Sequence, residues 1–242
     1  MIFNALTCQA ELKKYGLIPR KYYGQVFTVD ETIIKKLIEA VKSLYKPGTK
    51  IVEIGAGLGY ITEKLAENFD DIDALEIDEK MCSILYKKFI QQKNVQILPQ
   101  DILTYPLPQK DYILVGNIPF HASGKLYRRF MSDEKHKPYG MVFITDKQYA
   151  RTLMGQPPRC YRVSLQAQAY GTIEIVADVP PSSVYPEPKV MSCVMKIAHH
   201  PTPLPQNFWK VVNHHFENFP TREVESPKML NLRDWIELAK RL

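Results

Sequence analysis

The residues best placed to do chemistry begin with three glycines at alternate positions, Gly55, Gly57 and Gly59. They follow a short apolar run at 51–54, and a helical pattern starts directly after them. Because glycine has no side chain, such a turn lets the backbone approach a nucleotide-like ligand closely. Glu76 stands about twenty residues further on, where an acidic side chain would reach a ribose. The spacing predicts a nucleotide-like ligand, and a plain tight turn is the alternative.

Two more polar residues follow apolar runs further along the chain. Asp101 comes after residues 95–98, and Asn117 comes after residues 112–115. Strands and helices alternate through this region, which predicts a parallel sheet with right-handed crossovers. Ligands bind such sheets at the carboxyl ends of the strands. We therefore expect these residues, the glycine turn and the acidic residue after the second strand to share one rim.

The segment Asn117-Ile118-Pro119-Phe120 suits the methylation of an exocyclic amine such as that of adenine. The lone pair of this amine is delocalised into the ring, which makes the nitrogen a poor nucleophile. A side-chain oxygen and a backbone carbonyl can accept its two hydrogens, and proline offers no competing N–H. An aromatic ring at Phe120 can stack on an extruded base. The alternatives are a buried Asn before a proline turn and an NAD site, although the third glycine of Gly-x-Gly-x-x-Gly is missing.

The elements that must position these residues follow from hydrophobic spacing and from proline and glycine. Asp30 is a suitable N-cap for a helix whose apolar residues lie within 33–41. Further along, the pattern predicts a helix at 123–131, strands at 141–144, 164–169 and 172–176, a rigid proline-rich loop at 180–189, a last strand at 190–197 and a small helical part at 206–242.

The composition and the net charge limit the classes of protein to which the chain can belong. No apolar run is long enough to cross a membrane, and the first residues lack a secretory signal. The four cysteines have no metal or redox spacing, so we expect free thiols in a reducing compartment, the cytoplasm. The net charge of +6 favours a polyanionic partner, and basic residues alternate with tyrosines within 13–23. The pairs His199-His200 and His214-His215 indicate a solvated surface, and no metal is expected.

Taken together, these segments resemble the ribosomal RNA adenine dimethyltransferases, a family that includes small-subunit enzymes and the erythromycin-resistance methylases. The resemblance covers nearly the whole chain, and archaeal members of the small-subunit branch look most similar. It rests on the motifs Pro19-Arg20-Lys21, Gly24-Gln25-Val26-Phe27, Glu53-Ile54-Gly55-Ala56-Gly57-Leu58-Gly59, Glu76-Ile77-Asp78, Asp101-Ile102-Leu103, Asn117-Ile118-Pro119-Phe120, Tyr161-Arg162-Val163-Ser164 and the proline-rich segment 179–190.

The resemblance implies an α/β fold, a Rossmann-like class I methyltransferase sheet with helices on both faces and a small C-terminal helical domain. The implied domains are a basic N-terminal arm at 1–24, an S-adenosylmethionine-dependent methyltransferase domain at 25–198 and a shortened helical domain at 199–242. A monomer is expected, with ribosomal RNA of the immature small subunit as its partner and no membrane. The implied reaction is the N6-methylation, or dimethylation, of adenines in small-subunit ribosomal RNA.

The resemblance also assigns roles to individual residues. Gly55 and Gly57 would wrap the methionine part of S-adenosylmethionine, and Glu76 would take the ribose hydroxyls. Asp101 would read the cofactor adenine between Ile77 and Ile102. The cofactor set is completed by Gln25, Val26, Thr28 and Asn117; the implied catalytic residues are Asn117, Pro119 and Phe120, and the implied RNA contacts are Arg20, Lys21 and Lys189.

Three departures from the family pattern keep alternatives open. The family usually has Asn or His at Val26 and Leu at Thr28, so a side-chain contact to the cofactor is in question. Met191 stands where an acidic or polar residue is usual, and the C-terminal part is short and lacks the expected basic helix. A large-subunit methylase of the resistance type and a non-catalytic ribosome-assembly factor are the competing hypotheses.

Overall fold

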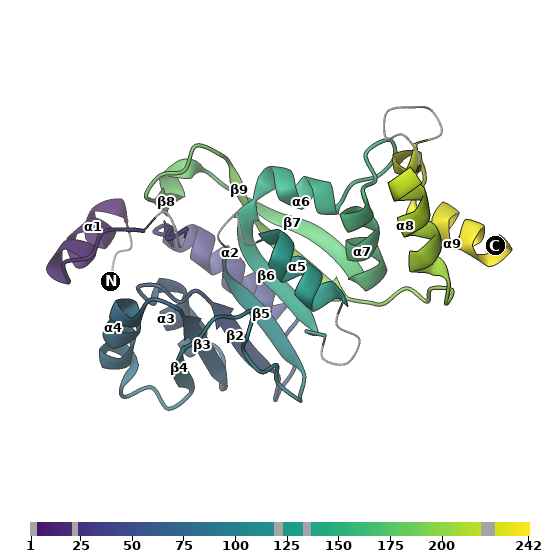
Figure 1. The fold of residues 1–242 in the computed structure, drawn as a ribbon. Helices are drawn as coiled ribbons and strands as arrows, with labels where there is room; N and C mark the ends of the chain where they lie inside the picture. Colours follow the sequence, from purple (N-terminus) through teal and green to yellow (C-terminus); the bar gives the residue numbers. More distant parts are fainter. Residues whose placement is uncertain (1–3, 21–23, 119–122, 133–136, 219–225) are drawn as a thin grey trace. The chain divides into compact units, whose positions relative to one another are not determined.

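The computed structural model describes residues 4–20, 24–118, 123–132, 137–218 and 226–242 of the chain (Figure 1). The chain divides into two compact units. The first comprises Met1–Lys147 and Ile175–Lys196, and the second comprises Gln148–Glu174 and Ile197–Leu242. The expected division into 1–24, 25–198 and 199–242 stays a prediction, because compact units and functional domains need not share borders.

The first unit is built on a sheet with the strand order β4-β3-β2-β5-β6-β9-β7. The pairs β2–β3, β3–β4, β2–β5 and β5–β6 are parallel, as expected. The chain order reverses on the two sides of β2, and such a switch point opens a crevice at the carboxyl ends of the strands. The strands are β2 (Lys50–Ile54), β3 (Ile72–Glu76), β4 (Val95–Pro99), β5 (Tyr112–Asn117), β6 (Gly140–Asp146), β7 (Gly171–Val179) and β9 (Ser192–His199).

Two helices of this unit begin at aspartates that cap them. Asp30 accepts backbone N–H bonds at the start of α2, and Asp78 does the same at the start of α4. The apolar residues expected on the first of these helices are buried, because they repeat at helical spacing along one face. The helices of the unit are α1 (Ala5–Lys14), α2 (Glu31–Lys42), α3 (Tyr60–Ala66), α4 (Glu79–Phe89) and α5 (Ser123–Ser132).

Helices cover both faces of the sheet. Val142 and Ile144 of β6 belong to the same buried cluster as the apolar face of α2. Phe143, between them in sequence, contacts the ring of Tyr127 in α5, with 5.9 Å between the ring centroids. Because successive side chains of a strand point to opposite faces, α2 and α5 lie on opposite sides of the sheet (Figure 1). The predicted Rossmann-like architecture is confirmed.

A second sheet has two strands, one from the segment before α2 and one from the proline-rich segment. Strand β1 (Phe27–Thr28) pairs antiparallel with β8 (Val184–Tyr185) from the proline-rich segment. The N–H of Val29 donates to the carbonyl of Ser183, and the hydroxyl of Ser183 donates to Asp30. The proline-rich segment, expected to be an extended loop, therefore contains a strand and a short 3-10 helix, Pro181–Ser183.

The second unit packs its helices around a small aromatic core. Trp235 of α9 and Phe208 of α8 are fully buried, together with Leu165 of α7. The C-terminal helices thus share a core with residues that precede 199. The helices of this unit are α6 (Lys147–Leu153), α7 (Arg162–Tyr170), α8 (Phe208–Asn218) and α9 (Leu232–Arg241), with the 3-10 helix Pro227–Met229.

One predicted strand is wrong. Residues 164–169 form part of the helix α7, although Leu165, Ala167 and Ala169 alternate as they would in a strand. The hydroxyl of Ser164 accepts from the N–H of Tyr161 at 3.0 Å, so a side chain of the first turn satisfies the N–H of the N-cap residue. Leucine, glutamine and alanine are also good helix formers, so local propensity and capping decide against the strand.

Candidate active site

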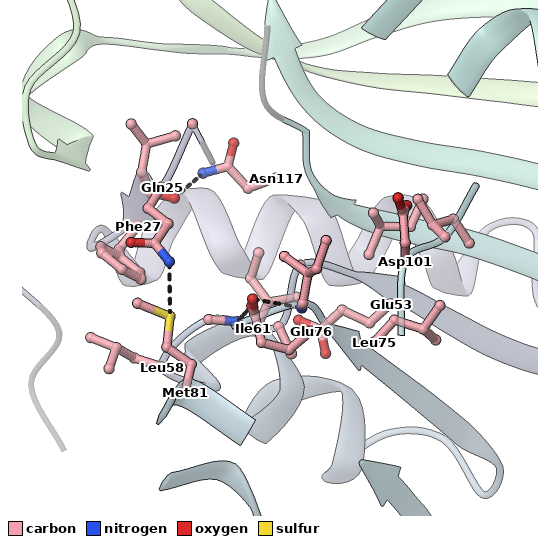
Figure 2. A pocket seen from close by; sticks show the side chains of 18 of the residues that line it. Gln25, Phe27, Glu53, Leu58, Ile61, Leu75, Glu76, Met81, Asp101 and Asn117 are labelled. Carbon is pink, nitrogen blue, oxygen red and sulfur yellow. Dashed lines mark hydrogen bonds between the residues drawn. The ribbon is translucent and has the colours of Figure 1, made fainter. Parts of the chain in front are cut away.

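A cavity of about 610 Å³ lies at the carboxyl ends of β2, β3, β4 and β5, within the first unit. Its wall includes the glycine turn after β2 and the segment around β1 (Figure 2). All ten expected cofactor residues line it: Gln25, Val26, Thr28, Gly55, Gly57, Glu76, Ile77, Asp101, Ile102 and Asn117. The predicted convergence of polar strand ends on one rim is thereby found, and their individual roles stay predictions.

The glycine turn brings the backbone close to this cavity. Gly57 has a φ of 57°, a conformation that side chains disfavour. A Cβ atom at this position would lie 3.1 Å from the ring of Phe27, closer than ordinary van der Waals contact. The turn therefore needs glycine both for its backbone angle and for the space that the ring fills.

Glu76 holds the turn in place through its carboxylate. One oxygen, Oε2, accepts from the N–H of Gly57 at 2.8 Å. The other, Oε1, accepts from the N–H groups of Ile77 and Asp78 at 2.8 and 2.9 Å. Burial raises the pKa of Glu76, and these three N–H bonds oppose that rise. The carboxylate can accept about four hydrogen bonds, so it has capacity left for a donor in the cavity.

A second buried carboxylate, Glu53, lines the same cavity and was not singled out from the sequence. The side chain is 1% exposed, and its Oε2 accepts from the hydroxyl of Thr62 at 2.6 Å. The pKa of Glu53 is raised to about 7, chiefly by burial and also by the charge of Glu76, while the Thr62 hydroxyl opposes the rise. The sequence does contain a signal for Glu53, because it is a single acidic residue within an otherwise apolar strand. Acidic side chains are seldom fully buried unless they have a partner.

The opposite part of the cavity combines apolar walls with one acidic group. Ile77 follows β3, and Asp101 and Ile102 follow the neighbouring strand β4. Oδ1 of Asp101 accepts from the N–H of Leu103 at 2.8 Å. Among the described residues Oδ2 has no hydrogen-bond donor, so it can accept from a ligand. A flat ring with an amino group fits such a pairing of aliphatic side chains and carboxylate oxygen.

Asn117 ends β5 and reaches across to the β1 segment (Figure 2). Its Nδ2 donates to the carbonyl of Val26 at 3.0 Å and to the hydroxyl of Thr28 at 3.3 Å. One acceptor lies in β1 and the other directly before it. Within the described part of the chain no donor contacts Oδ1 of Asn117. The amide thus offers an acceptor to the cavity.

Gln25 lines the cavity, and its side-chain amide makes hydrogen bonds to other residues of the protein. Its Oε1 accepts from the N–H of Arg20 at 2.8 Å, and its Nε2 donates to Asp78 at 3.1 Å. A guanidinium nitrogen of Arg20 lies 3.8 Å from the same carboxylate. Asp78 also caps α4, so a single aspartate ties the segment before β1 to the strand end that carries Glu76.

Two of the predicted RNA contacts, Arg20 and Lys189, are exposed and do not line the cavity. The third, Lys21, lies outside the described residues, as do Pro119 and Phe120. Lys125 of α5 lines the cavity and was not expected there.

Several broader expectations can be compared with the described residues. None of the helices in these ranges has the length and apolar character needed to cross a bilayer. No group of three or more His, Cys, Asp or Glu side chains within them is arranged to hold a metal ion. The four cysteines are buried free thiols, as predicted.

Comparison with known proteins supports the sequence motifs. A family model described as "Ribosomal RNA adenine dimethylase" matches residues 18–223. A protein of Dehalococcoides mccartyi named ribosomal RNA small subunit methyltransferase A is 33% identical over 201 residues, which cover 80% of this chain and 68% of the relative. An Escherichia coli protein named rRNA adenine N-6-methyltransferase is 28% identical over 202 residues, 83% of this chain and 80% of the relative.

A solved structure shares the fold. The crystal structure of the 23S rRNA methyltransferase ErmE superposes with a TM-score of 0.73 at 22% identity, covering 89% of this chain and 99% of the other. The particular similarity to archaeal members stays a prediction. The family model spans most of the chain, and the first of these relatives is matched over more than two thirds of its length. The chain belongs to the ribosomal RNA adenine dimethylase family.

Proposed function

We propose that the protein transfers methyl groups from S-adenosylmethionine to the N6 amine of adenines in ribosomal RNA, and that it dimethylates them. Family membership supports the reaction. The observation that carries it is the cavity itself, where a glycine turn, two strand-end carboxylates and the acceptor oxygen of Asn117 line a single space. These are groups that can bind a nucleoside and orient an amine.

The residues of the cavity fit S-adenosylmethionine in shape and in hydrogen-bonding capacity. A Cβ at Gly57 would crowd the ring of Phe27, and with glycine at this position the turn presents its backbone to the methionine end. Glu76 would accept from the ribose hydroxyls. Asp101 would accept from the adenine amine, with the ring between Ile77 and Ile102. When bound, the cofactor supplies an electrophilic methyl group on a sulfonium.

The chain itself prepares the target amine. Oδ1 of Asn117 accepts one N–H of the amine, and a backbone carbonyl of the segment Asn117-Ile118-Pro119-Phe120 accepts the other. Holding both hydrogens lets the nitrogen lone pair localise and directs it toward the methyl group. Phe120 stacks on the extruded base, with a contribution of about 1–3 kcal/mol. No general base is required, because the methylated amine carries a positive charge and loses its proton to water.

We assign the substrate to small-subunit ribosomal RNA, in an immature subunit, and the acting form to a monomer. The motif at 179–190 and the relative from Dehalococcoides mccartyi favour this choice. The relative named rRNA adenine N-6-methyltransferase is matched over a larger share of its length, 80% against 68%. A large-subunit substrate, which the resemblance to the erythromycin-resistance methylases leaves open, is the second candidate. The division into a basic arm at 1–24, a methyltransferase domain at 25–198 and a helical domain at 199–242 is part of this proposal.

The proposal is tested by incubating the protein with labelled S-adenosylmethionine and with unmethylated small or large ribosomal subunits. We expect label in the small-subunit RNA, at adenines that digestion and mass spectrometry identify as dimethylated. Asn117→Ala should abolish the transfer without lowering the melting temperature by more than a few degrees. Label in the large subunit would establish the second candidate. Binding of the cofactor and RNA without transfer to either subunit would favour a ribosome-assembly factor.

A further inference from the structure

We propose that Thr28 is a positioning residue for methyl transfer, which acts by taking up the second N–H of the Asn117 amide. The inference rests on the proposed function and adds one residue to those that orient the target amine. Thr28 lines the cavity and is buried. A buried hydroxyl at this place therefore suggests a specific polar contact.

The geometry of the Asn117 amide provides that contact. Nδ2 of Asn117 has two N–H groups, and it has two protein acceptors, the carbonyl of Val26 at 3.0 Å and Oγ1 of Thr28 at 3.3 Å. With both N–H groups engaged, the amide presents its oxygen to the cavity. If the amide were turned over, Oδ1 would face the Val26 carbonyl, and two acceptors would repel each other. The carbonyl of Val26, which can only accept, thus selects the orientation that amine chemistry needs, and the Thr28 hydroxyl completes it by accepting the second N–H.

The position of the hydroxyl is itself well defined. Thr28 is 3% exposed and lies in strand β1, where it pairs with Val184 of β8. The N–H of the next residue, Val29, donates to the carbonyl of Ser183 at 2.9 Å. The strand pairing fixes the backbone, and a β-branched side chain has few rotamers to choose from. Thr28 can therefore hold the amide more firmly than a flexible polar side chain could.

Removing the hydroxyl should leave one amide N–H without an acceptor at a strand end. Thr28→Val keeps the shape and the β-branch, and it removes only the acceptor. An unpaired donor of this kind weakens the native orientation by an amount that corresponds to roughly a tenfold loss in rate. Thr28→Ser keeps the acceptor, so it should retain most of the wild-type rate.

The experiment measures single-turnover methylation at saturating cofactor for wild type, Thr28→Val and Thr28→Ser. We expect about a tenfold lower rate for Thr28→Val, recovery in Thr28→Ser, and cofactor affinity within about twofold of wild type in both. Thr145→Val is the matched control: its hydroxyl is buried in the neighbouring strand β6 and has no hydrogen-bond partner among the described residues. Its rate should stay at the wild-type value.

A second measurement does not depend on turnover. In the ¹⁵N-labelled protein, the side-chain amide of Asn117 is identified as the signal pair that Asn117→Ala removes. In Thr28→Val one of its two protons should lose protection from solvent exchange, whereas in Thr28→Ser both should keep it. An unchanged exchange pattern in Thr28→Val would overturn the proposal, as would a normal transfer rate or a serine variant as slow as the valine one. If the wild type itself transferred no methyl group, the proposed function would fail while the exchange data still decided the role of Thr28.

Discussion

Replacing Glu53 by glutamine should change how the stability of the protein depends on pH. Glu53 is fully buried beside the glycine turn, and its pKa is about 7 in the folded protein against an ordinary value of 4.5. Between pH 4.5 and pH 7 the carboxyl group of Glu53 therefore keeps its proton in the folded state and loses it in the unfolded state. Where the native state holds more protons, the free energy of unfolding falls as the pH rises. The loss begins above pH 4.5 and is complete above pH 7.

The size of the effect follows from the pKa difference. One pKa unit corresponds to about 1.4 kcal/mol, so the ionised carboxylate lowers stability by about 3 kcal/mol at pH 8 and by less than about 1 kcal/mol at pH 5. Glutamine resembles the protonated acid: its oxygen can still accept from the Thr62 hydroxyl, and it does not ionise. The Glu53→Gln protein should match the wild type near pH 5 and exceed it by about 2–3 kcal/mol at pH 8.

The assay is urea unfolding without cofactor at several values between pH 5 and pH 8. The difference in the free energy of unfolding between the wild type and Glu53→Gln separates the contribution of Glu53 from those of the other ionisable side chains. Glu187→Gln, a change at an exposed glutamate, is the control and should shift all points by no more than about 0.5 kcal/mol. Two parallel stability profiles for wild type and Glu53→Gln would refute the reasoning, because the carboxylate would then not titrate in this range.

Two further predictions concern the ligands. Glu76→Ala should weaken cofactor binding by about 1.5–3 kcal/mol in calorimetry. It should also lower the melting temperature, because the carboxylate accepts hydrogen bonds from three backbone N–H groups. Glu79→Gln, a change at an exposed glutamate, is the control, and unchanged affinity in a folded Glu76→Ala protein would remove Glu76 from the site. Reversing the charges of Arg20 and Lys189 together should make the affinity for RNA less dependent on salt. The slope of log affinity against log salt concentration should become shallower by roughly 0.7–0.9 for each phosphate that the variant no longer neutralises. An unchanged slope would exclude both residues from the RNA-binding surface.

The strands and the rim of the cavity could be predicted because their signals are local. Short apolar runs ended by glycine or by an acidic residue are typical of buried strands, and parallel strands bring their ends together. Residues 164–169 show the limit of this reasoning. Their apolar residues alternate, yet the sequence also contains a capping serine and strong helix formers, and these decide for α7. A period of two over six residues is too short to exclude a helix.

Contacts between distant segments could not be derived from spacing. The bond from Asn117 to the carbonyl of Val26 joins residues that are 91 positions apart, and its geometry depends on how β1 pairs with β8. The buried state of Glu53 likewise depends on neighbours from α3. Sequence patterns indicated which residues carry chemistry, whereas the partners that orient them became visible only in three dimensions.

Two polar side chains of the cavity are held in the same way. The carboxylate of Glu76 accepts N–H bonds from the turn at Gly57, and the amide of Asn117 donates its N–H groups to the β1 segment. In both cases the protein engages part of a polar group and thereby orients the part that faces the ligand. Groups that are oriented before binding need no reorganisation during the reaction, and this is where preorganised sites gain most of their rate. Thr28 belongs to this arrangement, because a methyl transfer without a general base depends on how well the amine is held.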